Sequence, residues 1–263
     1  MEIIDDLGRM HILNKVPSRI ISLCPSLTET LFELGLADII IGRTDYCVHP
    51  EEMVNKIQSV GGPKNVSIAK VEMLNPDIIF SVKEESCRNV IEKIDRLYYK
   101  CFIFDINSFD DGLRMIKTIG LIFNKEKEAQ KLINKINYKF NKLKKIIPHL
   151  SFIYMVWSRP YIAAGSNNYI NSLLTGLGFA NCIISKAKER YLTMTANILK
   201  KNTPDVVFLP SEPYNYKESD KIKFEKIFPG ARIILVDGEM FCWYGSRMLP
   251  AMDYIKKMIN KFK

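Results

Sequence analysis

The first hundred residues alternate short apolar runs with amphipathic stretches. Four runs are almost entirely apolar and are predicted to be strands: residues 19–23, 38–41, 77–82 and 101–104. Strands that are apolar on both faces are typical of a parallel sheet with helices on each side. The stretch after the first strand is predicted to be a helix with Ser26 as its N-cap and Glu29 completing a capping box.

The longest helical pattern covers residues 125–147. Apolar side chains recur there at steps of three and four, with lysines between them: Ala129, Leu132, Ile133, Ile136, Phe140, Leu143 and Ile147. No glycine or proline interrupts the pattern, and Pro148 follows it. A continuous helix of this length is roughly 35 Å long. We expect a rigid connection between two halves of the chain; a coiled coil is the weaker alternative, because the stripe covers only about three heptads.

The second half of the chain again alternates apolar runs with amphipathic stretches. Strands are predicted at residues 151–156, 161–164, 205–209 and 232–236, and helices at residues 167–176 and 193–201. One repeat is specific, because residues 75–80 (NPDIIF) match residues 203–208 (TPDVVF) in kind and context. The sequence therefore predicts an α/β protein of two similar lobes with central, mostly parallel sheets. The expected division is an N-terminal lobe over 1–107, helices including the connecting helix over 108–147, and a C-terminal lobe over 148–263.

Charge and composition narrow the class of partner. The chain carries 38 Lys and Arg against 29 Asp and Glu, a formal net charge of +9. Much of the excess lies between Lys117 and Lys145, as on the solvated face of a helix. No arginine-rich stripe and no alternation of basic and aromatic residues occurs, so a nucleic-acid partner is not expected.

The cysteines and the N-terminal residues bear on the compartment. The six cysteines form no CxxC pair, which argues against a structural zinc site. The N-terminal residues are acidic and lack the basic and apolar regions of a signal peptide. As written, the sequence predicts a cytoplasmic protein with reduced thiols. If a leader precedes Met1 in the native gene product, the expected location is periplasmic or on the cell surface.

Candidate ligand-binding residues are sought beyond the carboxyl ends of the strands, because ligands of open α/β sheets bind there. Both tryptophans fall in these segments, together with several tyrosines and glutamates. Aromatic faces with a few polar anchors suit a large, flat, partly apolar ligand; the plainer alternative is that aromatic residues fill gaps in polar loops. The candidates are Ser26, Tyr46, Cys47, Lys83, Glu85, Trp157, Arg159, Tyr161, Glu212, Phe241, Trp243, Tyr244 and Arg247.

No catalytic arrangement is recognisable. The histidines His11, His49 and His149 have no metal-like spacing to one another. The nucleophile-elbow, P-loop and dinucleotide-binding motifs are absent. Asp45 lies near Cys47, but no histidine base accompanies the pair. The sequence predicts no enzyme, no catalytic cofactor and no metal ion held by the protein alone.

Several dispersed motifs resemble the helical-backbone, class III solute-binding proteins that serve ABC importers of cobalamin, haem and iron siderophores. The similarity covers nearly the whole chain and is greatest to the cobalamin-binding subgroup. The motifs are DDLGR at 5–9, PSLTE at 25–29, RTDYC at 43–47, GGPKN at 61–65, KEE at 83–85, PSEPY at 210–214 and WYGSR at 243–247.

The resemblance implies two Rossmann-like lobes joined by one long helix, with the ligand between them and only a small closure. It adds Lys64 to the candidates and makes Tyr46 the counterpart of an aromatic corrin contact. Trp157, Tyr161 and residues 241–244 fall in the matching region of the second lobe. A tryptophan contact of characterised cobalamin receptors falls at Tyr191-Leu192 here, and is therefore altered.

The expected function is that of a monomeric solute-binding protein for a corrinoid or a related metal chelate such as haem or a ferric siderophore. One alternative is a cytosolic corrinoid carrier or sensor that is not coupled to transport. Another is a receptor for a bare transition metal, against which three scattered histidines argue.

Coupling to an importer is expected to be loose. Importer-linked relatives carry a surface glutamate in each lobe, on the helix before the Pro-Asp strand, and these glutamates bind arginines of the permease. The matching positions are Ala69 in the first lobe and a position near Asn197 in the second, and neither residue is acidic. Glu72, one helical turn further on, could compensate in the first lobe.

Overall fold

The computed structural model describes residues 1–85, 87–183 and 189–260. They form two compact units, each of which is assembled from three separate segments of the chain. Unit 1 comprises Met1–Ile106, Asp110–Asn134 and Tyr244–Arg247, and unit 2 comprises Asn107–Phe109, Lys135–Trp243 and Met248–Lys263. A short C-terminal segment thus belongs to the unit built mainly from the N-terminal half.

Unit 1 is built on a four-stranded sheet in the order β4-β3-β5-β6, and all neighbours are parallel. Its strands are β3 (Ile20–Ser22), β4 (Ile40–Arg43), β5 (Ile78–Val82) and β6 (Cys101–Phe104). The predicted parallel sheet is therefore confirmed. The second strand begins later than predicted, because Ala37–Ile39 form a turn of 3-10 helix.

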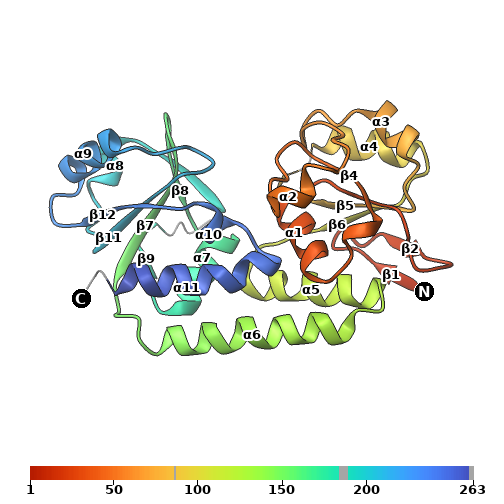
Figure 1. The fold of residues 1–263 in the computed structure, drawn as a ribbon. Coiled ribbons are helices and arrows are strands. Elements are labelled where there is room, and N and C mark those ends of the chain that lie inside the picture. The colour runs from red at the N-terminus through yellow and green to blue at the C-terminus, as the bar shows by residue number, and fades with distance from the viewer. Residues whose placement is uncertain (86, 184–188, 261–263) are drawn as a thin grey trace. The chain divides into compact units, whose positions relative to one another are not determined.

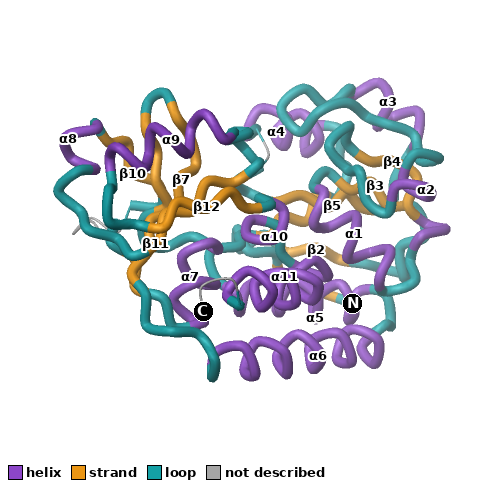
Figure 2. The backbone as a smooth tube through the Cα atoms, turned by 60° about the vertical axis from the view of Figure 1, so that its left-hand side comes forward, coloured by secondary structure: helices purple, strands orange, loops and turns teal. Residues whose placement is uncertain are grey.

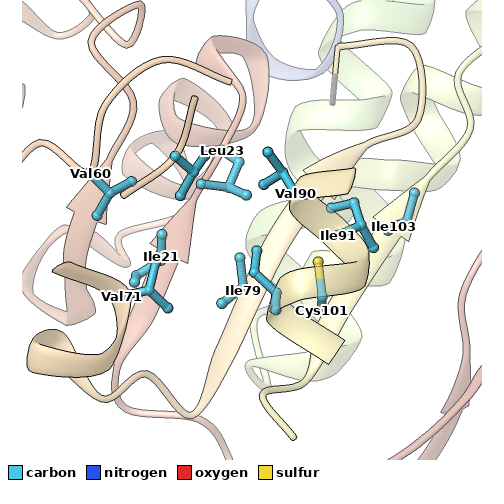
Figure 3. Packing of buried hydrophobic residues seen from close by; sticks show 11 residues of the cluster. Ile21, Leu23, Val60, Val71, Ile79, Val90, Ile91, Cys101 and Ile103 are labelled. Carbon is cyan, nitrogen blue, oxygen red and sulfur yellow. The ribbon is translucent and has the colours of Figure 1, made fainter. Parts of the chain in front are cut away.

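Helices cover both faces of this sheet (Figure 1). They are α1 (Pro25–Glu33), α2 (Glu51–Val54), α3 (Ile68–Leu74), α4 (Arg88–Arg96) and α5 (Phe109–Ile122). On one face, Val71 of α3 and Ile91 of α4 pack on Ile21, Ile79 and other strand residues, as Figure 3 shows for the core cluster. Each fully buried aliphatic side chain of this kind contributes roughly 1.5–3 kcal/mol relative to exposure.

The opposite face of the unit 1 sheet is aromatic. Phe80 lies 6.0 Å from both Phe102 and Phe104, measured between ring centroids, and 6.0 Å from Phe123, which follows α5. Alternating residues of β5 and β6 thus supply an aliphatic and an aromatic core, one on each face of the sheet.

The start of α1 differs from the prediction. Cys24 is the N-cap and Pro25 occupies the first turn, so Ser26 lies inside the helix, and no side chain caps it. Proline is well suited to the first helical position, because its missing N–H would have no partner there. The predicted capping box of Ser26 and Glu29 is therefore wrong.

An N-terminal hairpin is attached to unit 1 through Asp5. The strands β1 (Glu2–Ile4) and β2 (Met10–Ile12) pair antiparallel. The buried carboxylate of Asp5 accepts hydrogen bonds from the Arg9 guanidinium at 2.8 Å and from the backbone N–H of Leu7 at 3.0 Å and of Arg9 at 2.9 Å. His11 Nε2 lies 3.2 Å from Asp5 Oδ2, and the Ile103 N–H of β6 donates to the same oxygen at 3.3 Å.

Unit 2 is built on a mixed sheet in the order β10-β8-β7-β11-β12, with β9 also paired to β7. The strands are β7 (Ser151–Ser158), β8 (Tyr161–Ala164), β9 (Ala180–Asn181), β10 (Tyr191–Met194), β11 (Val206–Pro210) and β12 (Arg232–Val236). β11 pairs parallel with β7 and β12, as predicted, and β9 pairs parallel with β7, whereas β8 pairs antiparallel with both β7 and β10. The helix predicted over 193–201 is shorter than expected, because Thr193 and Met194 pair with β8 instead.

The helices of unit 2 lie on both faces of its sheet (Figure 2). They are α7 (Tyr169–Leu177), α8 (Ala196–Leu199), α9 (Glu218–Ile227), α10 (Glu239–Cys242) and α11 (Met248–Ile259). On one face Leu199 and Phe224 pack on Ile153 and Val207. On the other face Phe208 lies 5.6 Å from Phe241 of α10, between ring centroids.

The long connecting helix is α6 (Glu126–Lys144), a continuous helix of 19 residues. The prediction of one uninterrupted helix is confirmed, although it ends before Ile147. Residues up to Asn134 belong to unit 1 and residues from Lys135 belong to unit 2. Leu132, Ile136 and Leu143 are buried, as the apolar stripe predicted.

The sequence repeat corresponds to a repeated structural device. Asp77, just before β5, accepts hydrogen bonds from the backbone N–H of Ser18 at 2.7 Å and from its hydroxyl at 3.0 Å. Asp205, just before β11, accepts the same two bonds from Ser151, at 2.7 and 2.6 Å. These bonds lower the pKa of both carboxyls. In each unit, the aspartate of the repeat fixes the start of the neighbouring strand, β3 or β7.

Candidate functional site

In unit 1, the candidate residues meet around Glu85, which follows β5. Glu85 Oε1 accepts a hydrogen bond from the Cys24 thiol at 3.1 Å and from the Tyr244 hydroxyl at 2.8 Å. The sulfur of Cys24 lies 3.6 Å from the Tyr244 oxygen. Residues from the end of β3, the end of β5 and the C-terminal segment are thus brought together.

Burial fixes the protonation of the two groups that donate to Glu85. It raises the pKa of the Cys24 thiol well above its ordinary value, and the charge of Glu85 adds to this effect. Burial likewise raises the pKa of the Tyr244 hydroxyl, with Cys24 and Glu85 contributing. Both groups therefore keep their protons at neutral pH and act as neutral hydrogen-bond donors.

Tyr244 and its neighbours are bound to α1 of unit 1. The Ser246 N–H donates to the Thr30 hydroxyl at 3.0 Å, and Arg247 Nε donates to Glu29 Oε2 at 2.9 Å. Gly245 has a φ of +74°, and a Cβ atom there would lie 2.1 Å from Thr30 Oγ1. The segment therefore requires glycine for both its conformation and its close approach to α1.

Three candidates of unit 1 are buried in structural contacts. Ser26 is buried and lies 3.4 Å from the Tyr244 N–H. Cys47 accepts a hydrogen bond from the Thr28 hydroxyl at 3.0 Å and is also buried. Arg247 is only 8% exposed and is paired with Glu29. The structure gives these side chains roles in attaching loops to α1.

The remaining unit 1 candidates are exposed. Tyr46 is 64% exposed, so its ring is available to a ligand. Lys64 is also exposed. Lys83 forms an ion pair with Asp105, at 2.6 Å between Nζ and Oδ2. The positive charge of Lys83 is thus already compensated by a neighbouring acid.

In unit 2, Glu212 occupies a position similar to that of Glu85. It follows β11 and accepts a hydrogen bond from the Cys242 thiol at 3.2 Å. Burial raises the pKa of Glu212; the hydrogen bonds from Cys242 and from the Trp243 side chain oppose this effect, and the charges of Glu239 and Asp237 add to it. Glu212 is therefore held by a thiol and an aromatic N–H, as Glu85 is held by a thiol and an aromatic O–H.

Tyr154 belongs to this group although the sequence did not single it out. It lies in the middle of β7, is fully buried, and its hydroxyl has no hydrogen-bond partner among the described residues. Burial raises its pKa well above the ordinary value, and Cys242 and Glu212 contribute to the shift. A polar residue within the apolar run of 151–156 was the only signal for it in the sequence.

Two aromatic rings meet between the end of β7 and the loop after β11. The Trp157 ring is 5.4 Å from the Tyr214 ring, and its indole N–H donates to the Arg159 carbonyl at 3.2 Å. Trp157 is 40% exposed, whereas Trp243 is only 8% exposed. Because Tyr214 and Glu212 share the loop after β11, this loop presents a ring and a carboxylate together.

The other unit 2 candidates make contacts elsewhere in the unit. Phe241 is fully buried and packs on Tyr154 and Phe208, so it belongs to the core and leaves no area for a ligand. Tyr161 packs edge-on against Phe224 at 5.6 Å. Arg159 is exposed and interacts electrostatically with Asp220.

A cavity of about 540 Å³ lies over the edge strand β12, between α9 and α11, and none of the candidates lines it. Within residues 1–85, 87–183 and 189–260, no three His, Cys, Asp or Glu side chains are placed to hold a metal ion. Among the helices of those same residues, none is long and apolar enough to cross a bilayer.

Similarity to known proteins agrees with this architecture. A family profile described as "Periplasmic binding protein" matches residues 20–226. The uncharacterized ABC transporter substrate-binding lipoprotein YvrC of Bacillus subtilis (strain 168) is 26% identical over 276 residues, covering 97% of this chain and 84% of that protein. The high-affinity heme uptake system protein IsdE of Staphylococcus aureus (strain MRSA252) is 27% identical over 217 residues, covering 80% and 72%.

Solved structures show the same fold. The periplasmic vitamin B12 binding protein BtuF of Vibrio cholerae superposes with a TM-score of 0.78 at 15% identity, covering 94% of this chain and 98% of that one.

Proposed function

Because the chain belongs to the periplasmic binding protein family, we propose that it is a solute-binding protein whose ligand is a flat metal chelate of the corrinoid or haem type. Relatives named for ABC transport, heme uptake and vitamin B12 binding support this class of ligand. The ligand is cargo, and no catalytic cofactor is part of the proposal.

The observation that carries the proposal is the pairing of Trp157, at the end of β7, with Tyr214, in the loop after β11 that also holds the half-buried Glu212. An exposed ring edge and face provide contact area for a planar ligand, and a single acceptor fixes its orientation. Unit 1 likewise offers an aromatic ring, the exposed Tyr46, and a hydrogen-bonded carboxylate, Glu85.

Direct titration tests the proposal. Cyanocobalamin, dicyanocobinamide, haemin and a ferric hydroxamate siderophore would each be added to the full chain, with visible absorbance, tryptophan fluorescence and thermal unfolding as readouts. At a ligand concentration of a hundred times Kd, binding should stabilise the protein by about 2.7 kcal/mol. A protein whose melting temperature and spectra respond to neither the corrinoids nor haemin, or to the siderophore alone, would contradict the proposal.

An importer permease is the partner class that the relatives' names support. Ala69 on α3 and Asn197 on α8 are both exposed and uncharged, and Glu72 is exposed one turn beyond Ala69. We therefore propose that docking is weak compared with a chain that carries glutamates at both positions, since charge-assisted pairs with arginine are stronger than neutral contacts. A cytosolic carrier that is not coupled to transport is the second candidate, and it rests on the same two residues.

A further inference from the structure

We propose that the outer edge of β12 binds an acidic, extended segment of another protein, which adds to the unit 2 sheet as a further strand. In this mode of recognition, backbone hydrogen bonds supply the affinity and side chains beside the edge supply the selectivity. None of the candidate chelate-binding residues lines this edge, so such binding is separate from the proposed function.

The outer edge of β12 carries unpaired backbone groups. β12 is the last strand in the order β10-β8-β7-β11-β12, and among the described strands it pairs with β11 alone. The Arg232 N–H donates to the Asp205 carbonyl beside β11 at 2.9 Å. Because alternate residues of a parallel strand bond to the same neighbour, the N–H and C=O groups of Ile233 and Leu235 point away from β11. Within residues 1–85, 87–183 and 189–260, these groups have no hydrogen-bond partner.

Both edges of the unit 1 sheet are covered, in contrast. At β6, the Ile103 N–H donates to Asp5 Oδ2 at 3.3 Å, and the Ile103 carbonyl accepts from the Asp6 N–H at 3.0 Å. At β4, residues 58–60 exchange two backbone hydrogen bonds with Arg43. Proteins usually cover or shorten edge strands, because an open edge pairs readily with other chains. β12 has no such cover in the described part of the chain, so its edge is available for pairing.

A cavity of about 540 Å³ along this edge provides room for an added strand. Residues 232–235 line it on the β12 side, and side chains of α9 and α11 line it on the two flanks. A strand rises about 3.3 Å per residue, so four residues of a partner match this length of β12. The side chains of Ile234 and Leu235 are only partly buried and offer apolar contacts to alternate residues of the added strand.

The side chains that line the cavity favour an acidic partner. Lys221, Arg232 and Lys257 are cationic, and Glu218 is the one carboxylate among the described lining residues. Lys221 lies 4.0 Å from Glu218, and Arg232 acts on Asp205, so these charges are partly compensated. Lys257 is exposed and forms no ion pair with another described residue. The surface beside the edge therefore keeps an excess of positive charge, which attracts acidic peptides and repels basic ones.

A second copy of the chain is a poorer occupant of this edge. Pairing of two β12 strands would bring both copies of Arg232 and of Lys257 together, and like charges across a strand pair are destabilising. An acidic segment meets the same cations as counter-charges. We therefore assign the edge to an acidic partner and expect the chain alone to stay monomeric.

Two synthetic peptides of about seven residues, a usual strand length, provide the test. One alternates valine with glutamate, and the other alternates valine with lysine. With the full chain, we expect the acidic peptide to bind at least about tenfold more tightly than the basic one. It should also slow amide hydrogen exchange at Ile233 and Leu235 by about tenfold or more, because both N–H groups gain a partner. The Ile234 N–H faces β11 and should change less.

Three results would overturn the inference. They are equal or absent binding of the two peptides, binding of the acidic peptide without slower exchange at Ile233 and Leu235, and a dimer of the chain alone in which these amides are already protected. The second result would show that the cations attract the peptide without strand addition. None of these outcomes bears on chelate binding, which is measured separately.

A proline variant tests the backbone hydrogen bond itself. Leu235→Pro removes an outward N–H and leaves the bonds to β11 in place, since proline is tolerated where the N–H of an edge strand faces solvent. Leu235→Ala is the matched control, because it removes the side chain and keeps the N–H. The acidic peptide should bind Leu235→Pro at least about fivefold more weakly than Leu235→Ala. Equal affinities would show that the edge N–H is not used and would contradict strand addition.

A charge reversal on α11 tests the selectivity. Lys257→Glu should weaken binding of the acidic peptide by about tenfold or more, because it places a like charge beside the edge. Lys256→Glu makes the same change at an exposed neighbour that does not line the cavity, and it should have a smaller effect. Equal losses in the two variants would contradict recognition at the cavity. Hydrogen exchange in the wild-type chain needs no variant, so it decides the matter even if a substituted chain fails to fold.

Discussion

Asp5 holds the N-terminal hairpin on unit 1 through one buried carboxylate. Burial alone would raise its pKa, but the hydrogen bonds from Arg9 and His11 outweigh burial and lower it. The folded state therefore binds a proton at this carboxyl less readily than the unfolded chain does. The stabilisation from Asp5 is fully present above the ordinary range of an aspartate and is lost as the pH falls through the lowered pKa.

We expect Asp5→Asn to lower the free energy of unfolding by about 2 kcal/mol at neutral pH, because bonds to a charged acceptor are lost and Arg9 keeps a partly buried charge. Urea unfolding at a series of pH values measures this. The curves of variant and wild type should converge in acid. Asp110→Asn, at an exposed position on α5, is the control and should have little effect. A pH-independent difference would contradict the explanation.

The two tryptophans should respond differently to truncation. Trp157 is 40% exposed, so Trp157→Ala should weaken chelate binding with little change in melting temperature. Trp243 is nearly buried, so Trp243→Ala should lower both affinity and stability, by about 3 kcal/mol or more for the latter. Fluorescence titration and thermal unfolding of both variants distinguish the cases. Loss of fold in Trp157→Ala, with unchanged affinity, would identify it as a core residue.

The loops that carry the candidate site were easier to predict from the sequence than the individual residues that line it. Position after a predicted strand located Glu85 and Glu212 in loops, and Trp157 at the exposed end of β7. The same rule also selected Phe241, because position in the sequence does not determine which way a side chain points. Phe241 instead packs on Phe208 at the aromatic face of the unit 2 sheet. Tyr154 was missed for the opposite reason, since a tyrosine within an apolar strand is ordinarily a core residue.

At the scale of elements, apolar runs predicted the four strands of the unit 1 sheet and β7, β8, β11 and β12 of unit 2, but not β9 or β10, and the periodic stripe predicted α6. The errors arose where tertiary pairing or proline overrides local pattern. Thr193 and Met194 have a helical context, yet they pair with Ile162 and Tyr161 of β8. Pro25 sets the start of α1 one position before the serine that the capping motif favoured. The repeat at 75–80 and 203–208 could be recognised in the sequence, because in both units a Pro-Asp pair directly precedes an apolar strand.

The continuity of α6 leads to a prediction about Ile136. A proline there removes a backbone hydrogen bond and clashes with the preceding turn, which should cost about 3 kcal/mol or more in addition to the lost side chain. Ile136→Ala is the matched variant, since it removes the buried side chain and leaves the helix intact. Chemical denaturation of both should show Ile136→Pro clearly less stable than Ile136→Ala. Equal stabilities would indicate that the helix is already interrupted at this point.

For the whole molecule, importer docking is the testable property. The double variant Ala69→Glu, Asn197→Glu restores acids on the exposed faces of α3 and α8, and we expect it to bind the importer permease about tenfold more tightly, because each adds a charge-assisted pair. Pull-down on permease in detergent or nanodiscs measures this. Gln130→Glu with Asn134→Glu on α6 changes the net charge equally and should not increase binding. Tight binding by the unmodified chain would contradict weak docking.

The membership of Tyr244–Arg247 in unit 1 has a consequence for synthesis on the ribosome. Domains of a multidomain chain usually fold in order as they emerge, the N-terminal one first. Here the N-terminal unit lacks its last segment until nearly the whole chain has been translated. Until then, Thr30, Glu29 and Glu85 lack Ser246, Arg247 and Tyr244. The nascent first unit is therefore an unfinished intermediate, and a ribosome stalled before residue 244 would display a form that a chaperone or protease can distinguish from the released protein.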